Sequence, residues 1–196
     1  MLTASPSIAG LVLAAGAGTR YGQPKALVRD HSGVEWLVHA VDTLHESGCR
    51  PVIVVLGAGG AEAEARLRAS RADALVVHAA AWASGLSASL RAGLEAAVPL
   101  PAVAVVVIPV DVPDLTVATV TRVLDGRPDA HTLRQARFRG VPGHPVVLGR
   151  AHWARLTAGL DGDTGARDYL ASHDTVAIEC GDLSTGVDID RPPATT

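Results

Sequence analysis

Short apolar runs alternate along the chain with longer stretches in which apolar residues recur every three or four positions. The apolar runs are typical of buried β-strands, and they lie at Ile8–Ala14, Pro51–Leu56, Ala74–His78 and Ala102–Val110. The stretches with helical spacing follow them, at Val34–Leu44, Ala61–Ala69, Ser84–Val98 and Thr116–Leu124. Because parallel strands need a long crossover, usually a helix, this alternation predicts repeated β-α-β units.

The pattern becomes less regular after Pro128. Short strands are predicted at Leu133–Phe138, Pro145–Leu148 and Thr175–Ile178, and helices at Ala151–Leu156 and Thr164–Ser172. We therefore expect a single α/β domain over residues 1–196, with a Rossmann-like, mostly parallel sheet and helices on both faces. Its regular half is 8–127, and a less regular half, 128–192, extends the sheet or forms a small lobe.

Composition and charge narrow the class of protein. The 196 residues are 48 % hydrophobic and 19 % charged, which is typical of a globular chain with a sizeable core. A net charge of −3 and scattered basic residues argue against a nucleic-acid partner. No apolar run reaches the roughly 18 residues that span a bilayer, and no cationic leader precedes the first run. Cys49 and Cys180 are too few for a disulfide framework. We expect a cytoplasmic protein without a membrane partner.

The first predicted strand ends in a glycine-rich segment, Leu13-Ala-Ala-Gly-Ala-Gly-Thr-Arg-Tyr-Gly-Gln-Pro-Lys25. Lys25 is the only lysine among the 17 basic residues, and it lies in this segment. Ligands bind at the carboxyl ends of strands in open α/β sheets, and glycines let backbone amides approach a phosphate closely. Arg20 adds a forked donor and Lys25 a compact charge. The segment therefore predicts a phosphate-binding loop.

Two common phosphate-binding patterns fit this loop poorly. The Walker A string is absent. The dinucleotide-binding pattern is nearer, through Gly16, Gly18 and Gly22. However, it requires a helix that starts inside the loop and an acidic residue after the next strand, which ends here in Leu56-Gly57. A nicotinamide-dependent oxidoreductase is therefore kept only as an alternative, to be tested by whether NAD(P)H raises the melting temperature.

The loop resembles the L-A-[AG]-G-x-[SG]-x-R-[MF]-G-x-x-K signature of the molybdenum-cofactor nucleotidyltransferase family, closest to the branch that transfers CMP to molybdopterin. The resemblance implies a nucleotide-diphospho-sugar-transferase-like fold and a loop that holds the triphosphate of an NTP. The implied nucleotide-binding residues in this loop are Leu13, Ala14, Ala15, Gly16, Gly18, Arg20, Gly22 and Lys25. Arg20 and Lys25 are the implied catalytic charges. Ala15 stands where guanylyl-transferring relatives carry Gly, which favours CTP because a Cβ there narrows the room for a purine.

A carboxylate follows the most apolar predicted strand, in Pro109-Val-Asp-Val-Pro-Asp114. Mg²⁺ takes one or two carboxylates together with phosphate oxygens, so Asp111 is the candidate metal ligand. Asp114 stands just before the predicted helix at Thr116 and is the candidate helix cap. The segment also resembles the family's G-D-x-P motif, with Val110 in place of Gly.

A second acidic pair lies at Gly186-Val-Asp-Ile-Asp-Arg-Pro192. Alternation puts Asp188 and Asp190 on one face of a predicted short strand. Taken alone, the pair fits an exposed face. The segment resembles the family's D-I-D-x-P motif, which implies that Asp188, with Asp190 beside it, completes the magnesium site.

Three further segments resemble family elements around the nucleotide and the acceptor. Trp82–Gly93 resembles N-x-x-W-x-x-G-[ML]-x-x-S-L-x-x-G, which implies that Gly85 and Ser89 border the nucleotide; Ala79 stands at the usual Asn. Its Ser and Gly residues also open a predicted helix, where free amides favour anions.

The other two segments point to the acceptor. Gly140–Pro145 resembles G-x-x-G-H-P, so His144, on a predicted loop, is a candidate ligand of the acceptor's phosphate, with a structural turn as the alternative. Asp161–Arg167 resembles G-D-x-G-A-R, in which Asp163 can cap the next helix and Arg167 faces the acceptor or closes a contact between lobes.

The resemblance implies a Mg²⁺-dependent transfer of CMP from CTP to the phosphate of molybdopterin, with release of pyrophosphate and a molybdenum hydroxylase as a further partner. One alternative is a nucleotidyltransferase for a phosphorylated sugar or alcohol. Another is a non-catalytic molybdopterin carrier for a molybdenum hydroxylase. The presence of Lys25, Arg20 and both acidic motifs favours catalysis, because a carrier has no need to hold a metal and a triphosphate.

Overall fold

The computed structural model describes residues 7–192, and its elements follow the predicted order. The strands are β1 (Ser7–Ala14), β2 (Val52–Leu56), β3 (Leu75–His78), β4 (Ala102–Pro109), β5 (Leu133–Phe138), β6 (Val141–Gly149) and β7 (Val176–Glu179). The α-helices are α1 (Trp36–Glu46), α2 (Gly60–Ala69), α3 (Leu86–Ala97), α4 (Val117–Leu124), α5 (Arg150–Gly159) and α6 (Arg167–Ala171). Two 3₁₀ turns lie at Lys25–Leu27 and Trp82–Ser84.

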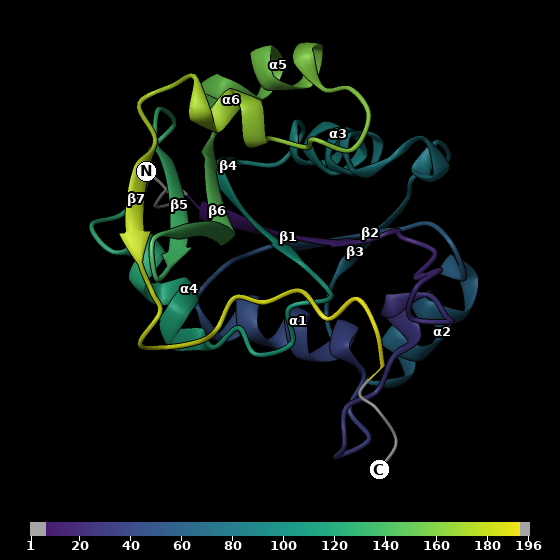
Figure 1. Ribbon diagram of the computed structural model, residues 1–196. Coiled ribbons are helices and arrows are strands. Elements are labelled where there is room, and N and C mark those ends of the chain that lie inside the picture. Colours follow the sequence, from purple (N-terminus) through teal and green to yellow (C-terminus); the bar gives the residue numbers. More distant parts are fainter. Residues whose placement is uncertain (1–6, 193–196) are drawn as a thin grey trace, which may run out of the picture.

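The strands of the described residues form one mixed sheet of seven strands, in the order β3-β2-β1-β4-β6-β5-β7. Strands β3, β2, β1 and β4 are parallel to one another, β6 is antiparallel to both β4 and β5, and β7 is parallel to β5. The expected Rossmann-like, mostly parallel sheet is confirmed. The irregular half continues the same sheet instead of forming a separate lobe (Figure 1).

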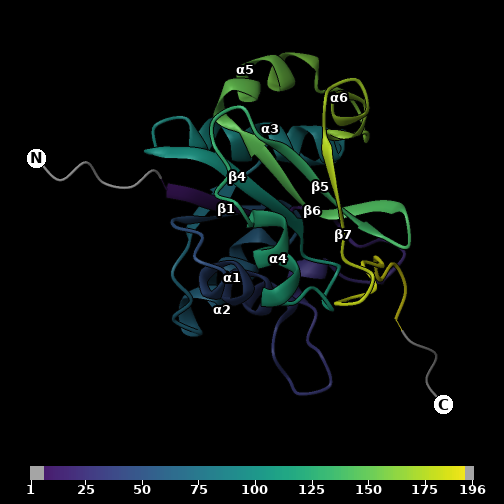
Figure 2. The same ribbon diagram turned by 90° about the vertical axis from the view of Figure 1, so that its left-hand side faces the viewer.

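Helices cover both faces of the sheet (Figures 1 and 2). Helices α1, α2 and α4 lie on one face, and α3, α5 and α6 lie on the other. The central strands are buried on both sides, which is why they are continuous apolar runs. Alternate residues of a strand pack into the two hydrophobic cores on opposite faces of the sheet. In β1, Val12 belongs to the core on the α1 side and Leu11 to the core on the α3 side. Helix α3 approaches β1 closely at Gly93, where a Cβ would lie 2.5 Å from a methyl group of Leu11.

Three local predictions are wrong. Strand β6 begins at Val141, so His144 lies in a strand and not in a loop, because the segment pairs with β5 as a hairpin. Residues 186–190 form no strand. Helix α4 is capped by Thr116, whose hydroxyl accepts a hydrogen bond from the Thr119 amide at 3.2 Å, and not by Asp114.

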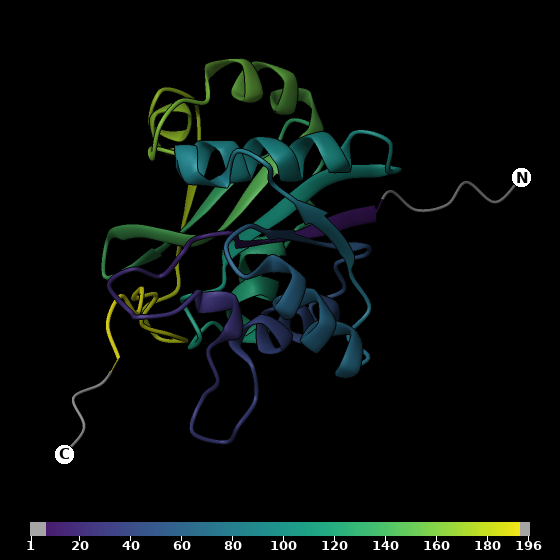
Figure 3. The ribbon, with the colours of Figure 1, turned by 90° about the vertical axis from the view of Figure 1, so that its right-hand side faces the viewer.

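Helices of the described residues are all too short or too polar to cross a membrane. The loop after β1 and residues 182–192 run next to each other at the edge of the sheet where β1 and β4 end (Figure 3). These two segments come from opposite ends of the sequence, and the sheet topology brings them together at the candidate site.

Candidate functional site

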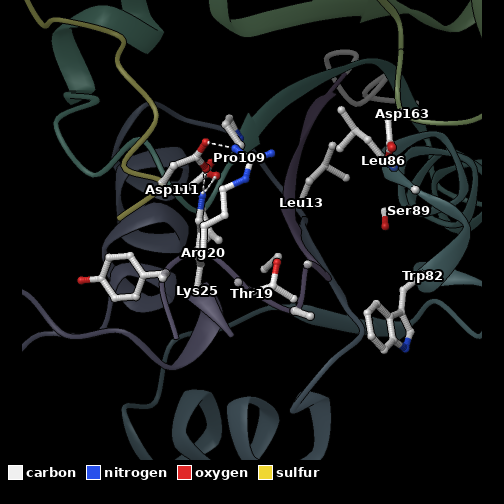
Figure 4. A pocket seen from close by; sticks show the side chains of 18 of the residues that line it. Leu13, Thr19, Arg20, Lys25, Trp82, Leu86, Ser89, Pro109, Asp111 and Asp163 are labelled. Atoms are coloured by element: carbon white, nitrogen blue, oxygen red, sulfur yellow. Dashed lines mark hydrogen bonds and ion pairs between the residues drawn. The ribbon is translucent and has the colours of Figure 1, made fainter. Parts of the chain in front are cut away.

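A cavity of about 630 Å³ opens at the carboxyl ends of β1 and β4. Its walls are the glycine-rich loop, the start of α3 and the acidic segments after β4 and near the C-terminus (Figure 4). The residues predicted from the sequence that line it are Leu13, Ala14, Gly16, Gly18, Arg20, Lys25, Gly85, Ser89, Asp111 and Asp190. Figure 4 shows Arg20, Lys25 and Asp111 on one side and Trp82, Leu86, Ser89 and Asp163 on the other, with Leu13 between them.

Two predicted loop residues lie outside the described lining of this cavity. Ala15 is buried, and its carbonyl accepts a hydrogen bond from the Ala58 amide at 3.1 Å. Its methyl group therefore does not narrow the cavity directly, which removes the steric reason for preferring a pyrimidine. Gly22 lies in the turn of the loop, with a φ of 93°, and its amide donates to the Gly18 carbonyl at 2.8 Å.

The loop depends on glycine at position 18. Gly18 has a φ of 60°, and a Cβ there would lie 1.9 Å from the Gln23 carbonyl oxygen, so no side chain fits. Gly16 differs, because a Cβ there would meet nothing within 4 Å. The fold of the loop therefore does not require Gly16. The absence of a side chain there leaves the backbone open to a ligand in the cavity.

Lys25 joins two acidic side chains that come from distant parts of the chain. Its ammonium lies 2.7 Å from Asp111 Oδ2 and 2.7 Å from Asp190 Oδ1, and Arg20 Nη1 lies 2.6 Å from Asp190 Oδ2. The Lys25 side chain is only 13 % exposed, whereas that of Arg20 is 70 % exposed. We call Arg20, Lys25, Asp111 and Asp190 the charge cluster.

The charges in this cluster support one another. Burial lowers the pKa of Lys25, but the hydrogen bonds and negative charges of Asp111 and Asp190 outweigh it, and the pKa lies above its ordinary value. The hydrogen bond and charge of Lys25, with a smaller contribution from Arg20, hold the pKa of Asp190 below its usual range. Lys25 is thus a fixed cation, and Asp190 a fixed anion, at neutral pH.

Asp188 faces a second cavity beside the first. Burial, together with the nearby negative charge of Asp111, raises the pKa of Asp188. The amide of Ile189, between the two C-terminal acids, donates to the Asp111 carbonyl at 2.8 Å. That bond holds the segment against the end of β4, with Asp190 in the first cavity and Asp188 in the second.

The second cavity, of about 690 Å³, lies between β5, β6 and α6. His144, Arg167 and Asp188, all predicted from the sequence, line it. Leu13, Leu86 and Asp163 line both cavities, so the two adjoin. The lining also includes Gln135, Arg137 and His173, which sequence reasoning missed; the two-residue spacing of Gln135 and Arg137 in a predicted strand was a usable signal, since it places them on one face.

His144 is a neutral imidazole at physiological pH. Burial lowers the pKa of His144 to about 4, and the negative charge of Asp111 offsets this only in part. As an uncharged side chain in β6, it can offer one donor and one acceptor to a bound group.

Asp163 does not cap the helix that follows it. Its Oδ1 instead accepts a hydrogen bond from the Leu86 amide at 3.1 Å, at the start of α3. Ser87 in the same helix turn donates its hydroxyl to the Asp161 carbonyl at 2.8 Å. The positive end of α3 therefore already has an anion from the chain itself. The Leu86 amide is therefore already paired, and the expectation that the amides at the start of this helix are open to a ligand anion is wrong for that residue.

The acidic side chains suit a hard divalent cation. Asp111, Asp188 and Asp190 offer only carboxylate oxygens, the donor type that Mg²⁺ and Mn²⁺ prefer. Within residues 7–192, no group of three or more His, Cys, Asp or Glu side chains could hold a metal ion by itself. A cation would therefore also need oxygens from a ligand, as Mg²⁺ does at phosphate sites. Asp111 and Asp188 would hold it, because both oxygens of Asp190 are paired with Lys25 and Arg20.

The fold and the two cavities define an α/β protein with a glycine-rich loop and a charge cluster at the carboxyl ends of the strands. The chain belongs to the family with the MobA-like NTP transferase domain, which matches residues 10–176. Its domain is thus of the nucleotidyltransferase type, as the resemblance implied.

Similar proteins cover almost the whole chain. Nicotine blue oxidoreductase of Paenarthrobacter nicotinovorans is 34 % identical over 194 residues, covering 94 % of this chain and 93 % of that protein. Rv0371c of Mycobacterium tuberculosis H37Rv, in complex with manganese, is 27 % identical with a TM-score of 0.73, over 93 % of this chain and 94 % of that chain. A nucleotidyl transferase from Methanothermobacter thermautotroptrophicus has a TM-score of 0.79 and 23 % identity, over 95 % and 93 % of the two chains. The last likeness confirms the fold.

Proposed function

We propose that this protein transfers CMP from CTP to the phosphate of molybdopterin, with Mg²⁺ and with release of pyrophosphate. The charge cluster carries the proposal, because two cations and two carboxylates meet at the mouth of a glycine-rich loop. The adjoining cavities support it: one offers backbone and cations to a triphosphate, and the other offers His144 and Arg167 to an acceptor.

In the proposed reaction, an oxygen of the acceptor's phosphate attacks the α-phosphorus of CTP in line. A new P–O bond forms as the bond from the α-phosphorus to the bridging oxygen breaks, and pyrophosphate leaves with that electron pair. No side chain has to form a covalent intermediate, so the chain contributes positioning and charge neutralisation.

Lys25 and Arg20 supply the neutralising charge. Before a nucleotide binds, Asp190 is their partner. Phosphate oxygens compete with Asp190 for both cations, and Lys25 remains beside Asp111 at the α-phosphate. A divalent cation held by Asp111 and Asp188 would neutralise the phosphates further. The manganese complex of Rv0371c supports a divalent metal in a protein of this fold.

The choice of CTP and molybdopterin rests on the loop signature and the later motifs, which resemble the cytidylyl-transferring branch. The test of this choice measures pyrophosphate release with CTP, GTP, ATP and UTP in turn, in the presence of Mg²⁺ or Mn²⁺. Each nucleotide is combined with molybdopterin, a sugar phosphate or a phosphorylated alcohol as the acceptor. We expect the fastest release with CTP and molybdopterin. Faster release with a sugar or alcohol phosphate would favour the first alternative, and tight molybdopterin binding without release would favour the carrier, for which a molybdenum hydroxylase is the proposed recipient.

Asp111→Asn tests the proposed metal ligand in the same assay. The metal concentration that gives half-maximal activity should rise at least about tenfold, because the amide is a weaker ligand than the carboxylate. The charge-matched control is Asp42→Asn, at an exposed position on α1. This variant should leave the metal concentration for half-maximal activity unchanged. An unchanged metal requirement in Asp111→Asn would count against the assignment.

A second candidate function is the reduction or oxidation of a small molecule with a nicotinamide cofactor. One observation favours it: nicotine blue oxidoreductase is 34 % identical over 93 % of its length. NADH and NADPH in a thermal-shift assay, with CTP and Mg²⁺ in parallel, discriminate the two proposals. We expect CTP with metal to raise the melting temperature more than either dinucleotide. The reverse order, with oxidation of NAD(P)H by an aromatic dye, would favour the oxidoreductase.

A further inference from the structure

Asp114 links the chain after β4 to the segment that carries the C-terminal acids. It lies three residues after Asp111, and its Oδ2 accepts two hydrogen bonds from Thr185, one from the amide and one from the hydroxyl, each 2.6 Å long. These contacts join positions 71 residues apart in the sequence. Thr185 in turn lies three residues before Asp188. The Asp114 carboxylate therefore connects the acidic motif after β4 to the acidic motif near the C-terminus.

Further contacts show that residues 182–190, which we call the C-terminal segment, lie along the chain that follows β4. The Ser184 hydroxyl lies 3.1 Å from that of Thr119, and the Ile189 amide donates to the Asp111 carbonyl at 2.8 Å. Gly186 makes the bend between them: its φ is 66°, and a Cβ there would lie 2.2 Å from the Phe138 ring. These contacts define the register of the segment against the residues that follow β4.

That register sets the geometry of the charge cluster. Ile189 separates the two acids, so the Ile189–Asp111 bond fixes both of them relative to Asp111. In this register, Asp190 contacts both Lys25 and Arg20. The Asp190 side chain is half exposed and is held by its ion pairs with Lys25 and Arg20, so those contacts depend on where the backbone before it is anchored.

The Asp114 carboxylate is not a favourable choice for stability alone. Among the described residues, its Oδ1 is buried without a hydrogen-bond partner, and an unpaired buried polar atom costs free energy. Its Oδ2, in contrast, makes two short bonds to one residue. The unpaired Oδ1 thus lowers the stability of the fold, while Oδ2 holds Thr185 in place.

We propose that Asp114 is a positioning residue, which holds Asp188 and Asp190 in register with Asp111 and Lys25 through Thr185. This inference rests on the proposed function for its catalytic consequence, because the register matters only if the acids and Lys25 receive a metal and a triphosphate. The structural part of the inference is that the Asp114–Thr185 contact, four residues upstream, anchors the Ile189 amide. This part does not depend on any activity.

Hydrogen exchange at the Ile189 amide tests the anchoring directly, in the whole chain. In Asp114→Ala, exchange of that amide should accelerate at least about tenfold, while the amides of α4 keep their protection. Asp114→Asn retains an oxygen acceptor for the Thr185 amide and should be intermediate. Asp182→Asn is the matched control: it removes an exposed ion pair with Arg122 at the other end of the same segment, and should leave Ile189 unchanged.

The same variants, titrated with Mn²⁺ in the pyrophosphate assay, test the consequence. Asp114→Ala should raise the half-saturating metal concentration about tenfold. Asp114→Asn should raise it less, and Asp182→Asn should leave it unchanged. Wild-type exchange at Ile189 in Asp114→Ala would overturn the proposal, and so would faster exchange with an unchanged metal requirement. A wild-type protein without metal-dependent activity would instead contradict the proposed function, and the exchange data alone would then decide the anchoring.

Discussion

At the residue scale, the two glycines of the loop have different physical roles. Gly18 is required by the backbone, because its φ is positive and a Cβ would collide with the Gln23 carbonyl. Gly16 has open space around the position of a Cβ. The sequence motif does not distinguish the two glycines, whereas the structure shows that the loop needs a glycine at position 18 and has room for a Cβ at position 16.

Paired alanine variants test this distinction. Gly18→Ala should lower the melting temperature and abolish nucleotide binding, because the strained position and the collision disturb the loop. Gly16→Ala should keep the melting temperature within experimental error, because a Cβ there meets nothing within 4 Å, but it should weaken nucleotide binding, because it adds a methyl group to the lining of the cavity. Calorimetric titration with CTP and differential scanning calorimetry measure both. Tight CTP binding by Gly16→Ala would show that the backbone there is not approached by a phosphate.

The lone lysine is the second feature at this scale. Lys25→Arg keeps the charge but replaces a compact ammonium, which contacts two carboxylates, with a planar fork. We expect turnover to fall about tenfold or more, with little change in melting temperature. Arg29→Lys, the reverse exchange at an exposed arginine paired with Glu35, is the control and should leave turnover unchanged. Full activity in Lys25→Arg would mean that charge alone suffices.

At the scale of the elements, α3 receives its N-terminal cap from a loop 77 residues further along the chain. The Asp163 carboxylate both accepts from the Leu86 amide and lines the two cavities. It joins the start of α3 to the loop between α5 and α6, and so forms part of the wall between the proposed nucleotide and acceptor sites.

Loss of that cap should be measurable. Asp163→Ala should lower the free energy of unfolding by about 1 kcal/mol, the usual cost of removing a helix cap, and Asp163→Asn by less. Urea denaturation gives both values. Asp161→Asn is the control, because Asp161 takes part through its backbone carbonyl. A destabilisation in Asp161→Asn equal to that in Asp163→Ala would argue for a general effect of loop charge.

The elements also show how far the sequence alone can go. Strands β1, β2 and β4 are buried on both faces, so their apolar runs predict them almost to the residue. The start of β6 carries Pro, Gly and His, and only its pairing with β5 makes it a strand. A local pattern contains no information about such a partner.

The same limit applies to the site. The glycine loop, Lys25, Asp111 and the C-terminal acids are visible in the sequence because each is a compact local motif. The partners of Asp114 and Asp163 are not, since both carboxylates bond to residues more than 70 positions away. Sequence reasoning placed each of them at the helix that follows it, where local rules put a cap.

At the scale of the whole molecule, side chains whose pKa values are shifted by the fold make stability depend on pH. The pKa of His144 is about 4, below its ordinary value, so between pH 6.5 and 4 the unfolded chain binds a proton that the folded chain does not. Stability therefore falls as the pH falls through that window. The lowered pKa of Asp190 acts in the same direction below about pH 4, and the raised pKa of Asp188 acts in the opposite direction.

Denaturation at pH 7 and pH 5 measures this dependence. The free energy of unfolding should fall by about 1–2 kcal/mol over that range, largely through His144. His144→Gln removes the titrating group, and its free energy of unfolding should change much less between the two pH values. Equal losses in the two proteins would show that other groups cause the acid sensitivity.

The whole molecule also brings the two ends of the sequence together. The loop after β1 and the C-terminal segment meet at one edge of a continuous sheet, where Lys25 contacts Asp190. The first half of the chain contributes the glycine-rich loop and Asp111, and the second half contributes Asp188, Asp190 and most of the lining of the second cavity. The division into an NTP-binding half, 8–127, and an acceptor-binding half, 128–192, remains a proposal.

Transfer of label from α-³²P-CTP to molybdopterin tests the central claim most directly. With Mg²⁺, the wild-type protein should place the label on molybdopterin, one pyrophosphate being released for each transfer. Lys25→Ala should lose about 100-fold or more of that transfer while it stays folded. Label that never reaches the acceptor with the wild-type protein, or transfer by Lys25→Ala at the wild-type rate, would contradict the account.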